Sequence, residues 1–71
     1  MTLKEFMDSH ILRPSPFAER AGIERQKFGR IYRAEQEASA SEASQIVTTL
    51  NELTGESLTV GDLWPPVGIA R

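Results

Sequence analysis

Three capping boxes divide this chain of 71 residues into helices. In each box a Ser or Thr and an acidic residue three positions later bond to each other's backbone N–H groups at the start of a helix. The boxes lie at residues 2–5, 39–42 and 59–62, and apolar residues recur around them at helical spacing. No stretch alternates polar and apolar residues as a strand does. The sequence therefore predicts an all-α fold.

Proline and glycine set the other helix ends. Pro14 and Pro16 push the residues before them out of the helical region, so the first helix should end near Leu12. Ser15 is the expected N-cap of a short second helix, which Gly22 should end in a left-handed conformation. We expect a compact bundle of four helices over residues 3–12, 16–21, 24–34 and 40–54, with a loop over 35–40 and a short fifth helical turn before Pro65.

The apolar residues of the first and fourth helices form one stripe on each. These stripes should face a common core. The expected core residues are Leu3, Phe6, Met7 and Ile11 on the first helix, and Ala43, Ile46, Val47, Leu50 and Leu53 on the fourth.

The length of the chain allows one small core, because chains split into separate domains only at far greater length. We expect a single domain over residues 1–64 and a loose tail over 65–71. The absence of cysteine excludes disulfides and thiolate metal sites and favours a reducing compartment. The N-terminus lacks the apolar segment of a signal peptide. We therefore expect a soluble, cytoplasmic protein.

Basic residues concentrate in the middle of the chain. The net charge is −2, yet residues 13–33 hold six basic residues against two acidic ones. Residues 34–71, in contrast, hold one arginine and six acidic residues. A basic stripe is typical of a surface that binds phosphates, although a solvated helix face gives the same pattern.

Residues 17–31 fit a helix-turn-helix. Two helices that cross steeply need a small residue at the crossing and a tight turn between them. Ala18 supplies the small residue and Gly22 the turn. The wedge between the two helices is filled by Phe17, Ala21, Ile23, Phe28 and Ile31.

The segment from Phe17 to Ile23, continued by Phe28-Gly29-Arg30-Ile31-Tyr32-Arg33, resembles the Cro/lambda-repressor-like (XRE-type) helix-turn-helix domains. Residues 53–64 also look like the closing segment of that family, and the resemblance covers residues 2–64. It implies a sequence-specific transcriptional regulator of phage, plasmid or bacterial type, above all a repressor, that is associated with the nucleoid. Its third helix would enter the major groove of a double-stranded DNA operator.

The outward face of the third helix carries side chains suited to base edges. At 100° per residue, its polar residues cover an arc of about 140° that points away from Phe28 and Ile31. Arginine and glutamine form paired hydrogen bonds with guanine and adenine. The predicted base-reading residues are Arg25, Gln26, Gly29 and Arg30; the predicted phosphate contacts are Ser15, Lys27 and Arg33, with Arg13 and Arg20 as weaker candidates.

Three residues of this region invite more than one interpretation. Gly29 lowers helix propensity, and it could serve close approach to DNA, packing against another helix, or neither. Pro14 stands where the family commonly has a phosphate-binding Gln, and Glu24 where it has a Ser or Thr cap. Glu24 would lie unfavourably close to a phosphate but could accept from a cytosine amino group.

A small domain binds an operator tightly when two copies occupy a two-fold site. We therefore expect a homodimer on DNA, with Trp64 and Val67 as the candidate contact residues, although Trp64 could instead close one end of the core. An antitoxin-like autorepressor is a close variant of this function. The alternative is a helix-turn-helix that binds protein, as an anti-repressor or assembly factor, which the acidic residues 34–71 would suit.

Nothing in the sequence indicates catalysis, a cofactor or a small-molecule ligand. His10 is the only histidine, and no second metal ligand or nucleophile has a recognisable spacing to it. No phosphate-binding Gly-rich loop is present either. We expect neither an enzyme nor a metal site.

Overall fold

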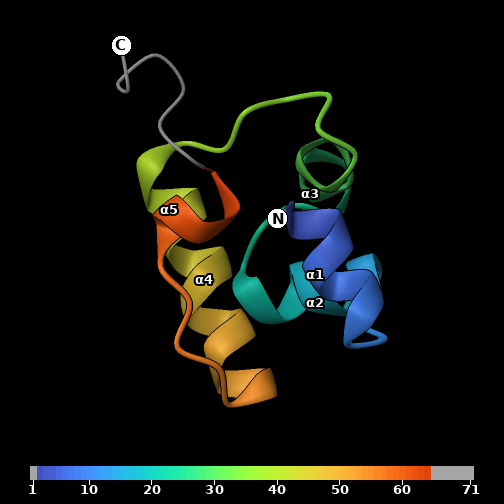
Figure 1. Cartoon of the computed structure of the whole chain (residues 1–71). Helices are drawn as coiled ribbons and strands as arrows, with labels where there is room; N and C mark the ends of the chain where they lie inside the picture. Colours follow the sequence, from blue (N-terminus) through green and yellow to red (C-terminus); the bar gives the residue numbers. More distant parts are fainter. Residues whose placement is uncertain (1, 65–71) are drawn as a thin grey trace, which may run out of the picture.

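The computed structural model describes residues 2–64, and these residues form helices and connecting turns with no strand among them. The all-α prediction is therefore confirmed. Figure 1 shows α4 and α5 on one side of the molecule and α1, α2 and α3 on the other. The helices are α1 (Leu3–Ser9), α2 (Pro14–Ala21), α3 (Arg25–Tyr32), α4 (Ala40–Thr54) and α5 (Val60–Leu63).

The core lies where the helices meet, and its largest fully buried side chains are Phe28, Met7, Ile46 and Leu50. The ring of Phe28 lies with its centre 5.1 Å from that of Phe17, which joins α3 to α2. Because the core draws on α1 to α5, each helix depends on the others for burial. Within the described residues, no helix has the length and apolar character needed to cross a membrane.

The helix-turn-helix prediction agrees with the packing of α2 and α3. Ala18 is fully buried, and its carbonyl accepts from the N–H of Ile23 at 3.0 Å. Gly22 has φ +76°, the left-handed conformation expected of it. All five residues of the predicted wedge are buried: Phe17, Ala21, Ile23, Phe28 and Ile31.

The three predicted capping boxes hold the starts of α1, α4 and α5. Thr2 and Glu5 form a complete capping box on α1, and Ser39 and Glu42 form another on α4. At α5 the N–H of Thr59 donates to the Asp62 carboxylate at 2.9 Å. These reciprocal bonds satisfy N–H groups that have no partner inside the helix.

The first helix is shorter than predicted, and the expected burial of Ile11 is wrong. The N–H of Leu12 bonds to the carbonyl of Met7 at 2.9 Å, and that of Ile11 bonds to Asp8 at 3.2 Å. This pair of bonds ends a helix through a left-handed residue, here Ile11 with φ +56°. The turn directs Leu12 toward the core and leaves Ile11 89% exposed.

Replacing Ile11 with glycine should raise the free energy of unfolding by about 1 kcal/mol, because a left-handed conformation strains any residue with a Cβ. The substitution removes little buried apolar surface, because the Ile11 side chain is already exposed. Urea unfolding measures the change. Ile11→Ala is the control, since it removes the same exposed side chain but keeps the Cβ. Equal gains from both variants would contradict the strain at this position.

Two further helix boundaries and the burial of Leu53 differ from the sequence prediction. α2 begins at Pro14 with Arg13 as its cap, so Ser15 is not the N-cap; a proline with its fixed φ suits the first helical position. α3 ends at Tyr32 rather than near Ala34, which is left-handed at φ +61°. Leu53 was expected in the core but is 41% exposed. The predicted tail over residues 65–71, including Val67, lies outside the described residues.

Candidate nucleic-acid interface

A hollow on the outer side of the helix-turn-helix gathers most of the predicted DNA-binding residues. We call it the α3 hollow. It joins the start of α2, the outward face of α3 and two residues of the loop that follows, Arg33 and Glu35. Its lining is Pro14, Ser15, Arg25, Gln26, Gly29, Arg30, Arg33 and Glu35.

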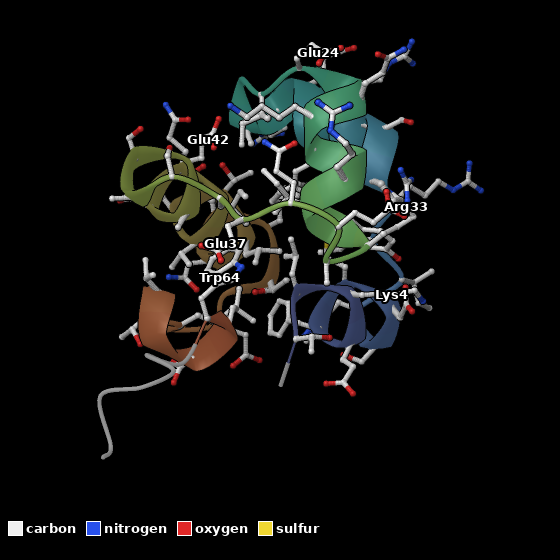
Figure 2. The ribbon with its side chains drawn as sticks, turned by 90° about the horizontal axis from the view of Figure 1, so that it is seen from above. Lys4, Glu24, Arg33, Glu37, Glu42 and Trp64 are labelled. Atoms are coloured by element: carbon white, nitrogen blue, oxygen red, sulfur yellow. The ribbon has the colours of Figure 1, made fainter. Side chains whose placement is uncertain are left out.

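The start of α3 fixes where these side chains project. Glu24 caps the helix, since its carboxylate accepts from the N–H of Lys27 at 3.1 Å. The carboxylate also lies at the positive end of the helix dipole, where a negative charge is favoured. Figure 2 shows Glu24 at the start of α3 and Arg33 beyond its other end. Glu24 therefore has a structural role as the N-cap of α3, in addition to the two interpretations of its position at the DNA.

A bond to α1 holds the other end of α3. The Tyr32 hydroxyl donates to Asp8 at 2.6 Å, and the Lys4 ammonium lies 5.7 Å from the centre of the Tyr32 ring. The bond to Asp8 raises the pKa of Tyr32, because it favours the protonated phenol. The hydrogen bonds from Lys4 and Tyr32 lower the pKa of Asp8. α3 is therefore held by its cap at one end and by α1 at the other.

The cationic side chains of the α3 hollow differ in their partners. Arg25 and Gln26 form no side-chain hydrogen bond or ion pair with residues 2–64. Arg30 donates through Nε to the side-chain oxygen of Gln36 at 2.8 Å. Because this bond uses only Nε, both terminal nitrogens of Arg30 remain able to donate to another acceptor.

Arg33 lies against two residues of the hollow. Its Nε donates to the Glu35 carboxylate at 3.1 Å, and its guanidinium covers Gly29. The three atoms nearest to a Cβ added at Gly29 all belong to that guanidinium, the closest at 3.3 Å. No other helix comes as near. The interpretation that Gly29 serves helix packing is therefore wrong.

Sequence reasoning missed Glu35 and Gln36. It treated both as part of a polar loop, whereas Glu35 lines the α3 hollow and Gln36 orients Arg30. The left-handed turn at Ala34 returns the chain toward α3, with the N–H of Glu35 bonded to the Arg30 carbonyl at 2.8 Å. Alanine carries no signal for such a turn, because glycine is the residue that usually marks it.

The remaining basic residues lie elsewhere. Lys27 forms an ion pair with Glu42 of α4, which lowers the pKa of that carboxyl because the ammonium donates a hydrogen bond to it. Arg13 and Arg20 line a different hollow, between α2 and the end of α4. The basic segment 13–33 therefore does not form one continuous surface.

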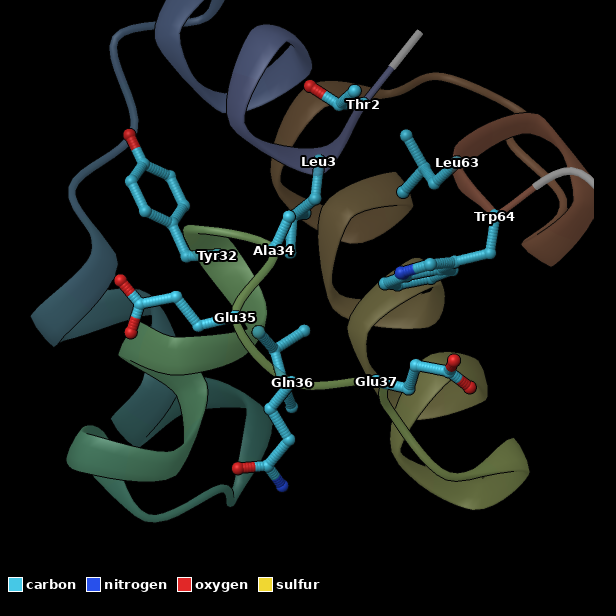
Figure 3. Close-up of a pocket in the computed structure, with 10 residues that line it drawn as sticks. Thr2, Leu3, Tyr32, Ala34, Glu35, Gln36, Glu37, Leu63 and Trp64 are labelled. Carbon is cyan, nitrogen blue, oxygen red and sulfur yellow. The ribbon is translucent and has the colours of Figure 1, made fainter.

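Trp64, one of the two predicted dimer contacts, is half-buried after α5 and packs against the core. It lines a hollow between α1, α5 and the 34–37 loop. Figure 3 shows its indole directed into this hollow, on the side of Glu37. Val67, the other predicted contact, lies outside the described residues.

Comparisons of the chain with protein-family models, curated proteins and solved structures find no significant match.

Proposed function

We propose that this chain is a sequence-specific double-stranded DNA-binding protein that regulates transcription, as the Cro/lambda-repressor-like family does. The observation that carries the proposal is the α3 hollow. Three side chains suited to base recognition, Arg25, Gln26 and Arg30, line one concave surface on the second helix of a helix-turn-helix. In such motifs the second helix is the one that enters the major groove.

The proposed contacts divide between bases and phosphates. Arg25 and Arg30 suit guanine, and Gln26 suits adenine, because each can form two hydrogen bonds to that base edge. Ser15 and Arg33 also line this hollow and would fix the register on the backbone. Pro14 has no donor for a phosphate, so Ser15 beside it is the candidate contact at the start of α2.

We further propose that two copies bind a two-fold operator and that occupancy of the operator represses transcription in the cytoplasm. One α3 hollow reads only a few base pairs, so a second recognition helix one helical turn away supplies the missing affinity. Trp64 is the candidate contact, since its indole is only half-buried and an aromatic side chain suits an interface.

Selection from a pool of random DNA duplexes tests the proposal. The full chain should enrich sequences with two related half-sites about 10 base pairs apart. The double variant Arg25→Ala/Arg30→Ala is the control and should enrich none of them. If the wild-type chain also enriches no sequence, the proposed function is wrong, and a helix-turn-helix that binds protein becomes the better interpretation.

Gly29→Ala should stabilise the protein and weaken its binding to the selected operator. Alanine raises helix propensity by up to about 1 kcal/mol, and the Arg33 guanidinium that it meets can move aside. The new methyl would, however, project into the α3 hollow. Thermal unfolding and operator titration measure the two effects. Higher stability with unchanged binding would show that Gly29 has no role at the DNA.

Glu35→Gln should raise the affinity for every duplex by roughly two- to fivefold, because the carboxylate repels phosphates and pairs with Arg33. The salt dependence should also become steeper as Arg33 is released. Glu37→Gln is the matched control: it removes the same charge from the same loop but outside the α3 hollow. Equal gains from both variants would assign the effect to net charge alone.

A further inference from the structure

Arg13 and Arg20 belong to a second hollow, formed by one face of α2, the turn after α1 and the last part of α4. We call it the α2–α4 hollow. Its lining is Leu12, Arg13, Pro16, Phe17, Arg20 and Leu53, and it shares no residue with the α3 hollow.

The centre of the α2–α4 hollow is apolar. Leu53 is 41% exposed there although it lies on the helix that supplies much of the core. Leu12 is half-buried, and Pro16 is exposed. Directly before Leu12 in the chain, Ile11 is 89% exposed in a strained conformation. Exposed apolar side chains grouped in this way are typical of a surface that contacts protein.

The ends of the hollow are cationic. Arg13 and Arg20 are seven residues apart, about two helical turns or 10 Å along α2, so they lie on the same face. Neither has a carboxylate of residues 2–64 within 4 Å, whereas Lys4, Lys27 and Arg33 all do. No acidic residue lines the hollow. Two unpaired guanidinium groups therefore flank an apolar centre.

We propose that the α2–α4 hollow binds an acidic segment of a partner protein. Large apolar side chains of that segment would fill the centre, and carboxylates at its two ends would pair with Arg13 and Arg20. Guanidinium and carboxylate form paired, charge-assisted hydrogen bonds. This function goes beyond DNA binding and does not depend on it.

A protein partner explains the hollow better than a phosphate does. A DNA backbone gains nothing from the apolar centre formed by Leu12 and Leu53. At 100° per residue, the mean direction of the lining residues of α2 lies about 160° from the mean direction of Pro14 and Ser15. A duplex seated on the α3 hollow would therefore leave this surface free, and the domain would hold DNA and protein on opposite faces of α2.

A displayed library of random 16-residue peptides, selected on the full chain, tests the proposal. In each round, peptides that bind the double variant Arg13→Gln/Arg20→Gln as well as they bind the wild-type chain are removed. The remaining sequences should combine acidic with large apolar residues, and their affinity for that variant should be at least tenfold lower. Arg13→Lys/Arg20→Lys is the matched control and should retain most of the binding, because it keeps both charges.

Circular dichroism must first show that the variants are folded, which the exposed positions of Arg13 and Arg20 favour. Enrichment of no peptide, or of peptides without carboxylates, would overturn the proposal. So would a loss of duplex affinity in Arg13→Gln/Arg20→Gln with a shallower salt dependence, since both arginines would then be phosphate contacts. If the wild-type chain binds no duplex, the peptide selection still decides the question.

Discussion

Arg25→Ala and Arg30→Ala should each lower the affinity for the selected operator by about 1–3 kcal/mol, or roughly 5- to 150-fold. Each loss should be confined to sequences that carry the preferred base at one or two positions. The reason is geometric, because a guanidinium donates two hydrogen bonds to one base edge. A water molecule in its place would leave one of the two base acceptors without a donor. Fluorescence titration against a panel of single-base operator variants measures the pattern.

Lys27→Ala is the matched control, since it removes the same charge from the same helix but outside the α3 hollow. It should weaken binding to all members of the panel about equally and make the salt dependence shallower. If Arg25→Ala and Lys27→Ala gave the same profile across the panel, the assignment of base-reading and phosphate-contacting residues would be wrong.

Arg30→Ala also tests the role of Gln36. In this variant the side-chain oxygen of Gln36 loses the one donor that residues 2–64 supply to it, but it lies near the surface, where water can replace the donor. We therefore expect no change in the unfolding transition. A clear loss of stability would mean that the Arg30–Gln36 bond supports the 34–37 loop in addition to orienting the guanidinium.

The sequence was sufficient wherever a local chemical rule acts within one helical turn. The capping boxes of α1 and α4 and the left-handed Gly22 follow from such rules, and the structure confirms them. The position of Arg25, Gln26 and Arg30 along one side of α3 follows from helix geometry alone. A reader of the sequence could therefore predict both the fold class and the centre of the α3 hollow.

Errors arose where the chain leaves a helix earlier than its apolar pattern suggests. A helical wheel assigns a face to Ile11 only if the helix continues, and the turn at that residue reverses the assignment. The same holds at Ala34, where an unexpected left-handed turn brings Glu35 and Gln36 to α3. Neither residue type favours this conformation, so local propensity predicts the opposite.

The sequence also could not show that the basic residues divide between two surfaces. Arg13 and Arg20 are close in sequence to Arg25 and Arg30, and a charge count treats them as one cluster. The direction of the side chains around α2 separates them, because both arginines project about 140–160° away from the buried Ala18 and line a hollow without any residue of α3. Only the tertiary arrangement distinguishes the α3 hollow from the α2–α4 hollow.

Leu50 and Leu53 provide the sharpest test of the packing, because they lie one turn apart on α4 and looked equivalent in sequence. Leu50 is fully buried, whereas Leu53 is 41% exposed. Leu50→Ala should therefore lower the free energy of unfolding by about 2–5 kcal/mol, and Leu53→Ala by roughly 1 kcal/mol or less. Urea unfolding at constant temperature measures both free energies, and equal losses would contradict the difference in burial between the two leucines.

Leu50→Ala should also lower the affinity for DNA, but by a different mechanism from Arg30→Ala. A domain of this length is only marginally stable, so Leu50→Ala should leave a measurable fraction unfolded. Only the folded fraction binds, and the apparent affinity for every duplex should fall in proportion to it. Arg30→Ala should instead leave the unfolding transition in place and change the preference among duplexes. A uniform loss of affinity with a lowered unfolding midpoint therefore reports on the core, and a base-specific loss with an unchanged midpoint reports on the α3 hollow.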